Sequence, residues 1–299
     1  MKQNNLNRLI VIGGPTAIGK TKVAIQLAQS LDTEIISADS RQIYQQLKIG
    51  VGRPSEQELN SVKHHLIGTV DIAQHYHTAD FERDSLKILE NIYHNHSDAI
   101  VCGGTGLYIK TLCDGIDEMP EINPEIRNSL NEQFEENGIN FLQEFIQEKD
   151  PELVAQIDMN NPKRLIRAVE MMIQTGQPFS SFRIGKKVVR NFIPQMFCLY
   201  DEREIIKKNI EIRVSQMIEN GWIDECIQLL PYRDIKALQT VGYKEIFNYL
   251  DGNMSLDETI CWIIIHTNQY AKRQLVWFRK DKRYVWVKST EEIIQHLNN

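Results

Sequence analysis

This sequence of 299 residues is poor in apolar runs, in cysteine and in excess positive charge. Its most apolar segment, residues 260–265, is far shorter than the roughly 20 residues needed to cross a bilayer. The five cysteines are scattered and contain no Cys-x-x-Cys pair, which argues against a disulfide framework or a zinc site. Residues 1–5 lack the pattern of a signal peptide. We therefore expect a cytoplasmic protein without a membrane segment.

The net charge of −6 shows no overall basic character, so a nucleic-acid partner would need basic residues that are concentrated locally. Against this background, short apolar runs alternate with helical patterns. The candidate strands are residues 8–12, 34–37, 99–102, 194–200 and 284–287. The candidate helices are residues 20–31, about 79–93, 202–230 and 256–280. This alternation predicts an α/β fold with a parallel sheet and helices on both faces.

The middle of the chain has a different composition. Residues 116–160 contain twelve acidic residues against two basic ones, with helical periodicity and no candidate strand. Residues 163–190 reverse the balance, with seven basic residues against Glu170 alone. A helix is expected from Pro162 to Gly176, because proline suits the first turn and glycine follows the end. We predict an all-helical insertion over residues 115–194 and a core formed by residues 1–114 and 195–299.

A phosphate-binding loop is predicted between the first strand and the first helix. Its residues, which match G-x-x-x-x-G-K-[ST], are Gly14, Pro15, Thr16, Ala17, Ile18, Gly19, Lys20 and Thr21. Such a loop directs backbone N–H groups toward phosphates, while Lys20 adds a charge and Thr21 a hydroxyl for Mg²⁺. The predicted fold is therefore P-loop nucleotide-triphosphatase-like. Most proteins with this loop transfer or hydrolyse a γ-phosphoryl group, so a small-molecule kinase is one interpretation.

Polar residues follow the second and third candidate strands. Asp39 comes directly after residues 34–37, and the segment 103–106 (Gly-Gly-Thr-Gly) follows residues 99–102. The carboxyl ends of parallel strands form the usual edge for an active site. We expect Asp39 and Thr105 at the same sheet edge as the phosphate loop.

Five segments together resemble the tRNA dimethylallyltransferases. They are the phosphate loop, residues 37–44 (SADSRQIY), 103–108 (GGTGLY), 161–170 (NPKRLIRAVE) and 270–279 (YAKRQLVWFR). This resemblance covers nearly the whole chain in consistent order. It implies transfer of a dimethylallyl group from dimethylallyl diphosphate to N6 of the adenosine 3′-adjacent to the anticodon, with release of diphosphate. It also implies an all-helical insertion that binds the anticodon stem-loop.

The resemblance assigns three catalytic residues. Asp39 would accept the proton of the attacking amine. Arg213 would bind the diphosphate through its guanidinium, and Thr105 would contact the diphosphate or the target nucleotide. In this interpretation the phosphate loop and Mg²⁺ stabilise a leaving group, and ATP is not needed.

The resemblance also assigns a set of contacts to tRNA. These are Asp39, Ser40, Arg41, Gln42, Thr105, Arg127, Lys163, Arg164, Leu165, Ile166, Arg167, Gln239, Gly242, Lys244, Lys272, Arg273 and Arg279. The basic ones would bind the RNA backbone, and those beside Asp39 would read an adenosine flipped out of its stack. We expect a monomer.

Two departures from the family pattern are present. Residues 51–54 are Val-Gly-Arg-Pro where the family usually has Thr-Ala-Lys-Pro, and Asn268 stands where an arginine is usual. Adenylate prenyltransferases of the cytokinin type share the loop and the sheet, and they remain an alternative. They would have less need of the insertion and of the basic segment 163–167. A non-enzymatic, ATP-switched nucleic-acid binding module is a further alternative.

Overall fold

The computed structural model describes residues 7–117, 119–183, 185 and 188–298. These residues form two compact units, each with its own core. The first unit comprises residues 7–114 and 189–298, and the second is Gly115–Val188. The predicted boundary at residue 194 is too late, because the strand that returns to the first unit begins at Phe192.

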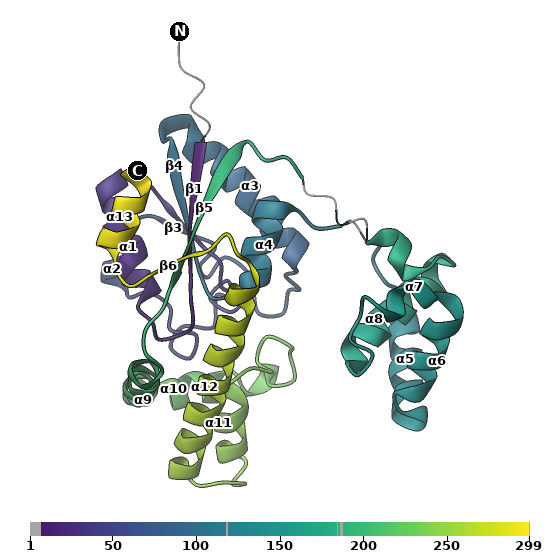
Figure 1. The fold of residues 1–299 in the computed structure, drawn as a ribbon. Coiled ribbons are helices and arrows are strands. Elements are labelled where there is room, and N and C mark those ends of the chain that lie inside the picture. Colours follow the sequence, from purple (N-terminus) through teal and green to yellow (C-terminus); the bar gives the residue numbers. More distant parts are fainter. Residues whose placement is uncertain (1–6, 118, 184, 186–187, 299) are drawn as a thin grey trace. The chain divides into compact units, whose positions relative to one another are not determined.

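A six-stranded parallel sheet organises the first unit (Figure 1). The strands are β1 (Asn7–Gly13), β2 (Ile35–Ser37), β3 (His64–His65), β4 (Asp98–Cys102), β5 (Phe192–Leu199) and β6 (Val285–Val287), in the order β3-β2-β4-β1-β5-β6. In the centre, Leu9 of β1 lies between Ala99 and Pro194. Pro194 is tolerated because β6 pairs only with residues 197–199 of β5, so this part of β5 is an edge.

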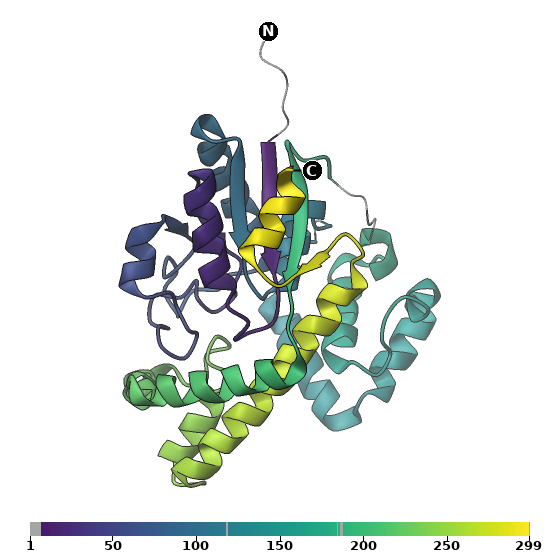
Figure 2. The ribbon, with the colours of Figure 1, turned by 60° about the vertical axis from the view of Figure 1, so that its left-hand side comes forward.

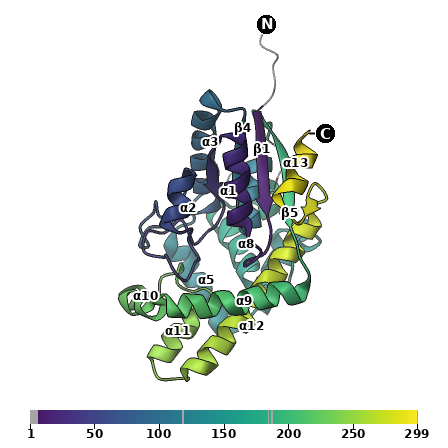
Figure 3. The ribbon, with the colours of Figure 1, turned by 90° about the vertical axis from the view of Figure 1, so that its left-hand side faces the viewer.

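Helices cover both faces of the sheet because its strands are apolar on both sides (Figures 1 and 3). Ile10 and Ile12 pack in one cluster with α1 (Lys20–Leu31) and α13 (Thr290–Asn298). Leu9 and Val11 pack in the other, with α3 (Thr78–Asn95) and α4 (Gly106–Asp114). The short helix α2 (Glu56–Ser61) precedes β3. This arrangement confirms the predicted α/β fold class.

A group of helices lies beyond the carboxyl ends of the strands (Figures 1 and 2). The group contains α9 (Arg203–Glu219), α10 (Trp222–Gln228), the 3₁₀ turn η2 (Leu230–Tyr232), α11 (Tyr243–Leu250) and α12 (Leu256–Lys280). The single helix predicted over 202–230 is wrong, because Gly221 adopts a left-handed conformation with φ of 92° and separates α9 from α10. None of the described helices is long and apolar enough to span a membrane.

The second unit is helical, as predicted. It contains α5 (Pro124–Asn137), α6 (Asn140–Lys149), α7 (Pro151–Val154), α8 (Pro162–Thr175) and the 3₁₀ turn η1 (Phe179–Phe182). Asn161 caps the start of α8 by accepting a hydrogen bond from the Arg164 N–H, and Gly176 ends it with φ of 69°. Leu142 and Leu165 are fully buried in the small core between these helices.

Gly103 should be one of the least replaceable residues of the first unit. A β-carbon there would lie 2.1 Å from the carbonyl oxygen of Ala38, which is backbone and cannot move aside. Gly103→Ala should therefore lower the free energy of unfolding by about 1–3 kcal/mol, as measured by denaturant titration. Gly252→Ala shows the cost of backbone strain without crowding, because Gly252 has φ of 76° and no atom within 4 Å of the added carbon. An unchanged free energy of unfolding in Gly103→Ala would contradict the crowding.

Candidate active site

The loop between β1 and α1 has the backbone of a phosphate-binding loop. Gly14 has φ of 146° and Gly19 has φ of 91°, and Ala17 is one of few described residues other than glycine with positive φ, at 61°. A β-carbon on Gly14 would lie 3.0 Å from the Leu199 carbonyl oxygen of the neighbouring strand. The loop is therefore tightly curled against β5, and α1 begins at Lys20 with its N–H groups facing the loop.

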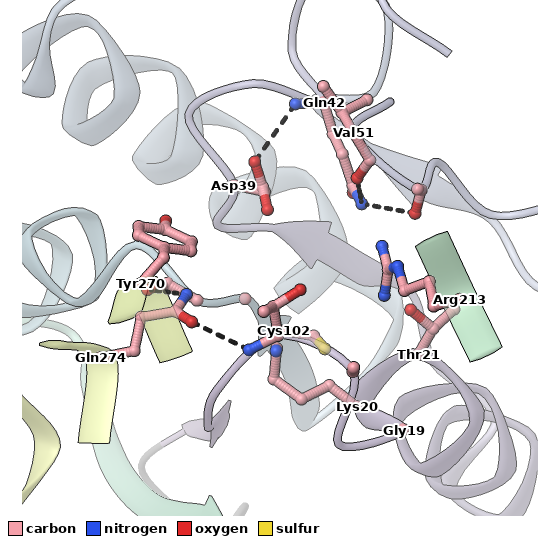
Figure 4. A pocket seen from close by; sticks show the side chains of 15 residues that line it. Gly19, Lys20, Thr21, Asp39, Gln42, Val51, Cys102, Arg213, Tyr270 and Gln274 are labelled. Atoms are coloured by element: carbon pink, nitrogen blue, oxygen red, sulfur yellow. Dashed lines mark hydrogen bonds between the residues drawn. The ribbon is translucent and has the colours of Figure 1, made fainter. Parts of the chain in front are cut away.

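A cavity lies at this edge of the sheet (Figure 4). It is lined by Thr16, Ala17, Gly19, Lys20, Thr21, Asp39, Gln42, Val51, Gly52, Cys102, Gly103, Gly104, Arg213, Tyr270 and Gln274. The phosphate loop, the end of β2, the glycine turn after β4 and two distant helices all contribute. The fold thus gathers the predicted loop, Asp39 and Arg213 around one space, all within the first unit.

Two cationic side chains line the cavity. Lys20 Nζ donates a hydrogen bond of 2.7 Å to the Pro15 carbonyl oxygen, and burial lowers the pKa of Lys20 to about 8. Burial also lowers the pKa of Arg213, although the charge of Asp39 opposes this shift. Within the described part of the chain, no carboxylate forms an ion pair with either cation. Two partly desolvated cations without such a partner suit an anionic ligand with several charges.

Asp39 is oriented by the turn that follows β2. Its Oδ1 accepts hydrogen bonds from the backbone N–H groups of Arg41, at 2.8 Å, and Gln42, at 3.3 Å. Its Oδ2 receives no hydrogen bond from the described residues, and Asp39 lines the cavity. One carboxylate oxygen is therefore used to hold the turn, and the other is available to accept a proton.

Thr105 connects two loops at the sheet edge. Its hydroxyl oxygen accepts a hydrogen bond of 3.0 Å from the Ser40 N–H, and its own N–H donates to the Ala38 carbonyl oxygen at 3.1 Å. Unlike Gly103 and Gly104, it is not among the residues that line the cavity. Its observed contacts hold the Asp39 turn in place.

Gln274 of α12 was not among the predicted site residues. Its Oε1 accepts a hydrogen bond of 2.8 Å from the Thr16 N–H, and its Nε2 donates to the Gly104 carbonyl oxygen at 3.0 Å. The side chain thus joins the phosphate loop to the glycine turn, and Tyr270 lines the cavity one helical turn earlier (Figure 4). Two features of the sequence point to Gln274. It lies in the segment 270–279 that resembles the family, and it follows Ala271 by three positions, which places both residues on one face of a helix.

The predicted tRNA contacts of the first unit fall in three places. Ser40 and Arg41 are half-buried beside Asp39, and Lys272, Arg273 and Arg279 are exposed on α12. Gln239 and Lys244 line a second cavity that also includes the half-exposed Trp262 and His266. Gly242 itself is buried, with φ of 93°.

Asn268 does not reproduce the charge that is usual at its position. Its side-chain N–H donates to the Ile264 carbonyl oxygen of its own helix at 2.9 Å. The Asn268 side chain therefore bonds to the backbone of its own helix, and it carries no positive charge.

In the second unit, the basic segment of α8 contains both exposed and buried residues. Lys163 and Arg164 are exposed, Arg167 is partly so, and Ile166 is only half-buried. Leu165 is 0% exposed and packs in the core, so its side chain has no surface for RNA. The Arg127 guanidinium donates to both carboxylate oxygens of the buried Glu170, at 2.7 and 3.0 Å.

A residue for Mg²⁺ is present in the first cavity. The Thr21 hydroxyl lines it, and Mg²⁺ commonly takes one or two protein oxygens together with phosphate oxygens and water. The described residues contain no group of three or more His, Cys, Asp or Glu that could hold a metal ion alone. The donor set therefore fits an ion that binds together with a diphosphate.

A parallel sheet with a glycine-rich loop after its first strand, and with a cationic cavity at its carboxyl edge, defines a P-loop-like α/β protein suited to a polyanionic ligand. The chain belongs to the IPP transferase family, whose sequence profile matches residues 42–281. The family expected from the five motifs is thus confirmed.

Similar proteins extend over nearly the full chain. A tRNA dimethylallyltransferase of Christiangramia forsetii is 46% identical over 285 residues, which cover 95% of this chain and 94% of that protein. The crystal structure of a tRNA isopentenylpyrophosphate transferase from Bacillus halodurans has a TM-score of 0.71 and 33% identity, covering 98% of this chain and 95% of that one. A eukaryotic dimethylallyltransferase acting on tRNA has a TM-score of 0.76 and 27% identity, covering 91% and 69%.

Binding of inorganic diphosphate should be coupled to protonation of Lys20. An anion beside this amine stabilises its charged form, so the pKa of about 8 in the free protein rises on binding. Affinity should be fully present below this pH and fall by up to about tenfold per unit as the pH rises above it. Calorimetry in buffers of different ionisation enthalpy measures the proton uptake. Lys20→Met corrects for the titration of diphosphate itself, and an identical pH profile in both proteins would contradict the coupling.

Proposed function

We propose that this protein transfers the dimethylallyl group of dimethylallyl diphosphate to N6 of the adenosine 3′-adjacent to the anticodon in tRNA. The bond between the allylic carbon and the diphosphate oxygen breaks, and the bond between that carbon and N6 forms. The amine proton passes to Asp39, and diphosphate leaves. The observation that carries the proposal is one cavity with two cations, Lys20 and Arg213, and one available carboxylate oxygen of Asp39.

Stabilisation of the leaving group is the main task of the phosphate side of the cavity. An allylic C–O bond breaks readily once the charge that develops on the diphosphate is neutralised. Lys20 and Arg213 supply that neutralisation together with the N–H groups of the curled loop, in a partly desolvated space where electrostatic effects are large. Mg²⁺ held by Thr21 together with the diphosphate would add Lewis-acid stabilisation of the same charge.

The base side of the cavity is Asp39. Its Oδ1 is held by the Arg41 and Gln42 N–H groups, which leaves Oδ2 to accept the amine proton. The turn that carries Asp39 is fastened to Thr105, so the carboxylate is held by contacts that extend beyond its own loop.

The RNA partner is supported by the exposed basic residues of α8 and α12. Lys163 and Arg164 expose their charges on α8, and Arg273 exposes its charge on α12. The names of the similar proteins, which include a dimethylallyltransferase acting on tRNA, support the same substrate. We also propose that the protein is a cytoplasmic monomer. The free cysteines of the described chain are compatible with a reducing cytoplasm.

The reaction is tested by transfer of labelled dimethylallyl diphosphate, with Mg²⁺ and without ATP, to unmodified tRNA, AMP or ATP in parallel. We expect label on tRNA only. Asp39→Asn should reduce kcat by about 10²–10⁴-fold, because the amide keeps the Oδ1 acceptor of the turn but cannot take the proton. Diphosphate binding should persist in this variant. Label on AMP would instead indicate cytokinin-type synthesis, and turnover of ATP without transfer would indicate a kinase.

Contact of α8 with the RNA backbone is tested by salt dependence. Arg164→Ala should weaken binding of an anticodon stem-loop and lower the slope of log K against log salt concentration by about 1, because one phosphate contact is lost. Lys149→Ala is the control, since Lys149 lies on α6 and pairs with the adjacent Glu148. Fluorescence anisotropy at several salt concentrations gives both slopes. An unchanged slope in Arg164→Ala would exclude a contact between Arg164 and a phosphate.

A further inference from the structure

Glu225 of α10 is a buried acidic residue to which the reaction assigns no role. Its side chain is 9% exposed. Oε2 accepts hydrogen bonds from the N–H groups of Lys48, at 2.9 Å, and Ile49, at 2.7 Å, and Oε1 accepts from the Gly50 N–H at 3.1 Å. The Tyr243 hydroxyl donates to Oε1 at 2.7 Å. One carboxylate therefore satisfies three successive backbone N–H groups.

These bonds determine the path of residues 48–52, here called the wall loop. Successive N–H groups alternate in direction along a strand, and those of a helix interior bond to carbonyl groups four residues earlier, so three N–H groups on one carboxylate require a curled loop. The curl is tight, because a β-carbon on Gly50 would lie 2.0 Å from the Trp222 indole nitrogen. Without an anionic acceptor, the three N–H groups would be left unsatisfied beside an apolar core.

The wall loop continues directly into the catalytic cavity. Val51 and Gly52 line the cavity, and their carbonyl oxygens accept hydrogen bonds from Gln42 Nε2 at 3.3 and 3.0 Å. Gly52, with φ of 57°, lies against the Arg213 guanidinium so closely that a β-carbon would be 1.6 Å from Nη2. The wall loop thus contacts Arg213, one of the two cations of the site, and also the side-chain amide of Gln42.

We propose that Glu225 is a positioning residue that acts through the wall loop. By holding residues 48–50, it places Gly52 where Arg213 can occupy the space left by the missing side chain, and it places the carbonyl groups that orient Gln42. The inference rests on the proposed function, because it concerns the diphosphate side of that site. It also gives the Val51-Gly52 departure a structural role, since Arg213 fills the volume that an alanine at position 52 would need.

The first test compares Glu225→Gln with Tyr243→Phe. The amide places N–H groups where the wall loop needs an acceptor, whereas the phenylalanine removes only the phenol donor and keeps the three backbone bonds. Calorimetry with inorganic diphosphate and Mg²⁺ should show about tenfold weaker binding for Glu225→Gln and less than about threefold for Tyr243→Phe. The KM for the anticodon stem-loop should stay near the wild-type value, which separates a positioning effect from general loss of structure.

A double-mutant cycle with Arg213 supplies the decisive readout. If Glu225 acts through Arg213, then Glu225→Gln should lower kcat/KM for dimethylallyl diphosphate in the wild-type background and have much less effect in an Arg213→Met background. A purely structural role would give the same loss in both backgrounds, and that result would overturn the inference.

Gly52→Ala tests the same loop without touching Glu225, and it keeps the inference testable if Glu225→Gln does not fold. The added carbon should displace Arg213 and weaken diphosphate binding by about tenfold, again with little effect in the Arg213→Met background. Unchanged binding in Gly52→Ala would contradict the inference. Failure of the wild-type protein to bind diphosphate would instead contradict the proposed function.

Discussion

The structure depends on one electrostatic constraint, which is the presence of two cations in a single cavity without a carboxylate in ion-pair contact within the described chain. Lys20 and Arg213 are kept partly desolvated, and burial lowers the pKa of each. Such an arrangement costs stability in the free protein, so it requires a rigid surrounding. The parallel sheet, the curled loop after β1 and the helices beyond its carboxyl edge supply that surrounding, and they leave the charge available for an anionic ligand.

The acid and the cations of the cavity are held by backbone contacts that converge from separate elements. Asp39 is fixed by its own turn and by Thr105, while Gln274 joins the phosphate loop to the glycine turn. Arg213 lies against Gly52, in a loop fastened by Glu225. Each reactive group is therefore supported by a neighbour that does not itself react, as preorganised electrostatic catalysis requires.

The sequence predicts the central features of this arrangement because they are local. Apolar runs identify β1 and β4, and the spacing of Gly14, Gly19 and Lys20 identifies the loop. The helix break at Gly221 and the two-residue strand β3 are too short to change the hydrophobic periodicity of the sequence, so neither was predicted. The contacts that Gln274 and Glu225 make could not be predicted, since their partners lie 258 and 176 residues away in the chain. Burial of Leu165 likewise follows from packing within the second unit.

The helix α12 fixes the spacing between the two cavities described in the first unit. Its 25 residues form one continuous rod, on which Trp262 and His266 line the second cavity and Tyr270 and Gln274 line the first. Since each residue advances a helix by about 100° and 1.5 Å, the separation and relative orientation of the two cavities are set by the number of residues between His266 and Tyr270. A single insertion there would rotate Gln274 away from both loops. The two cavities therefore constrain the length of this stretch more tightly than the identity of its exposed side chains.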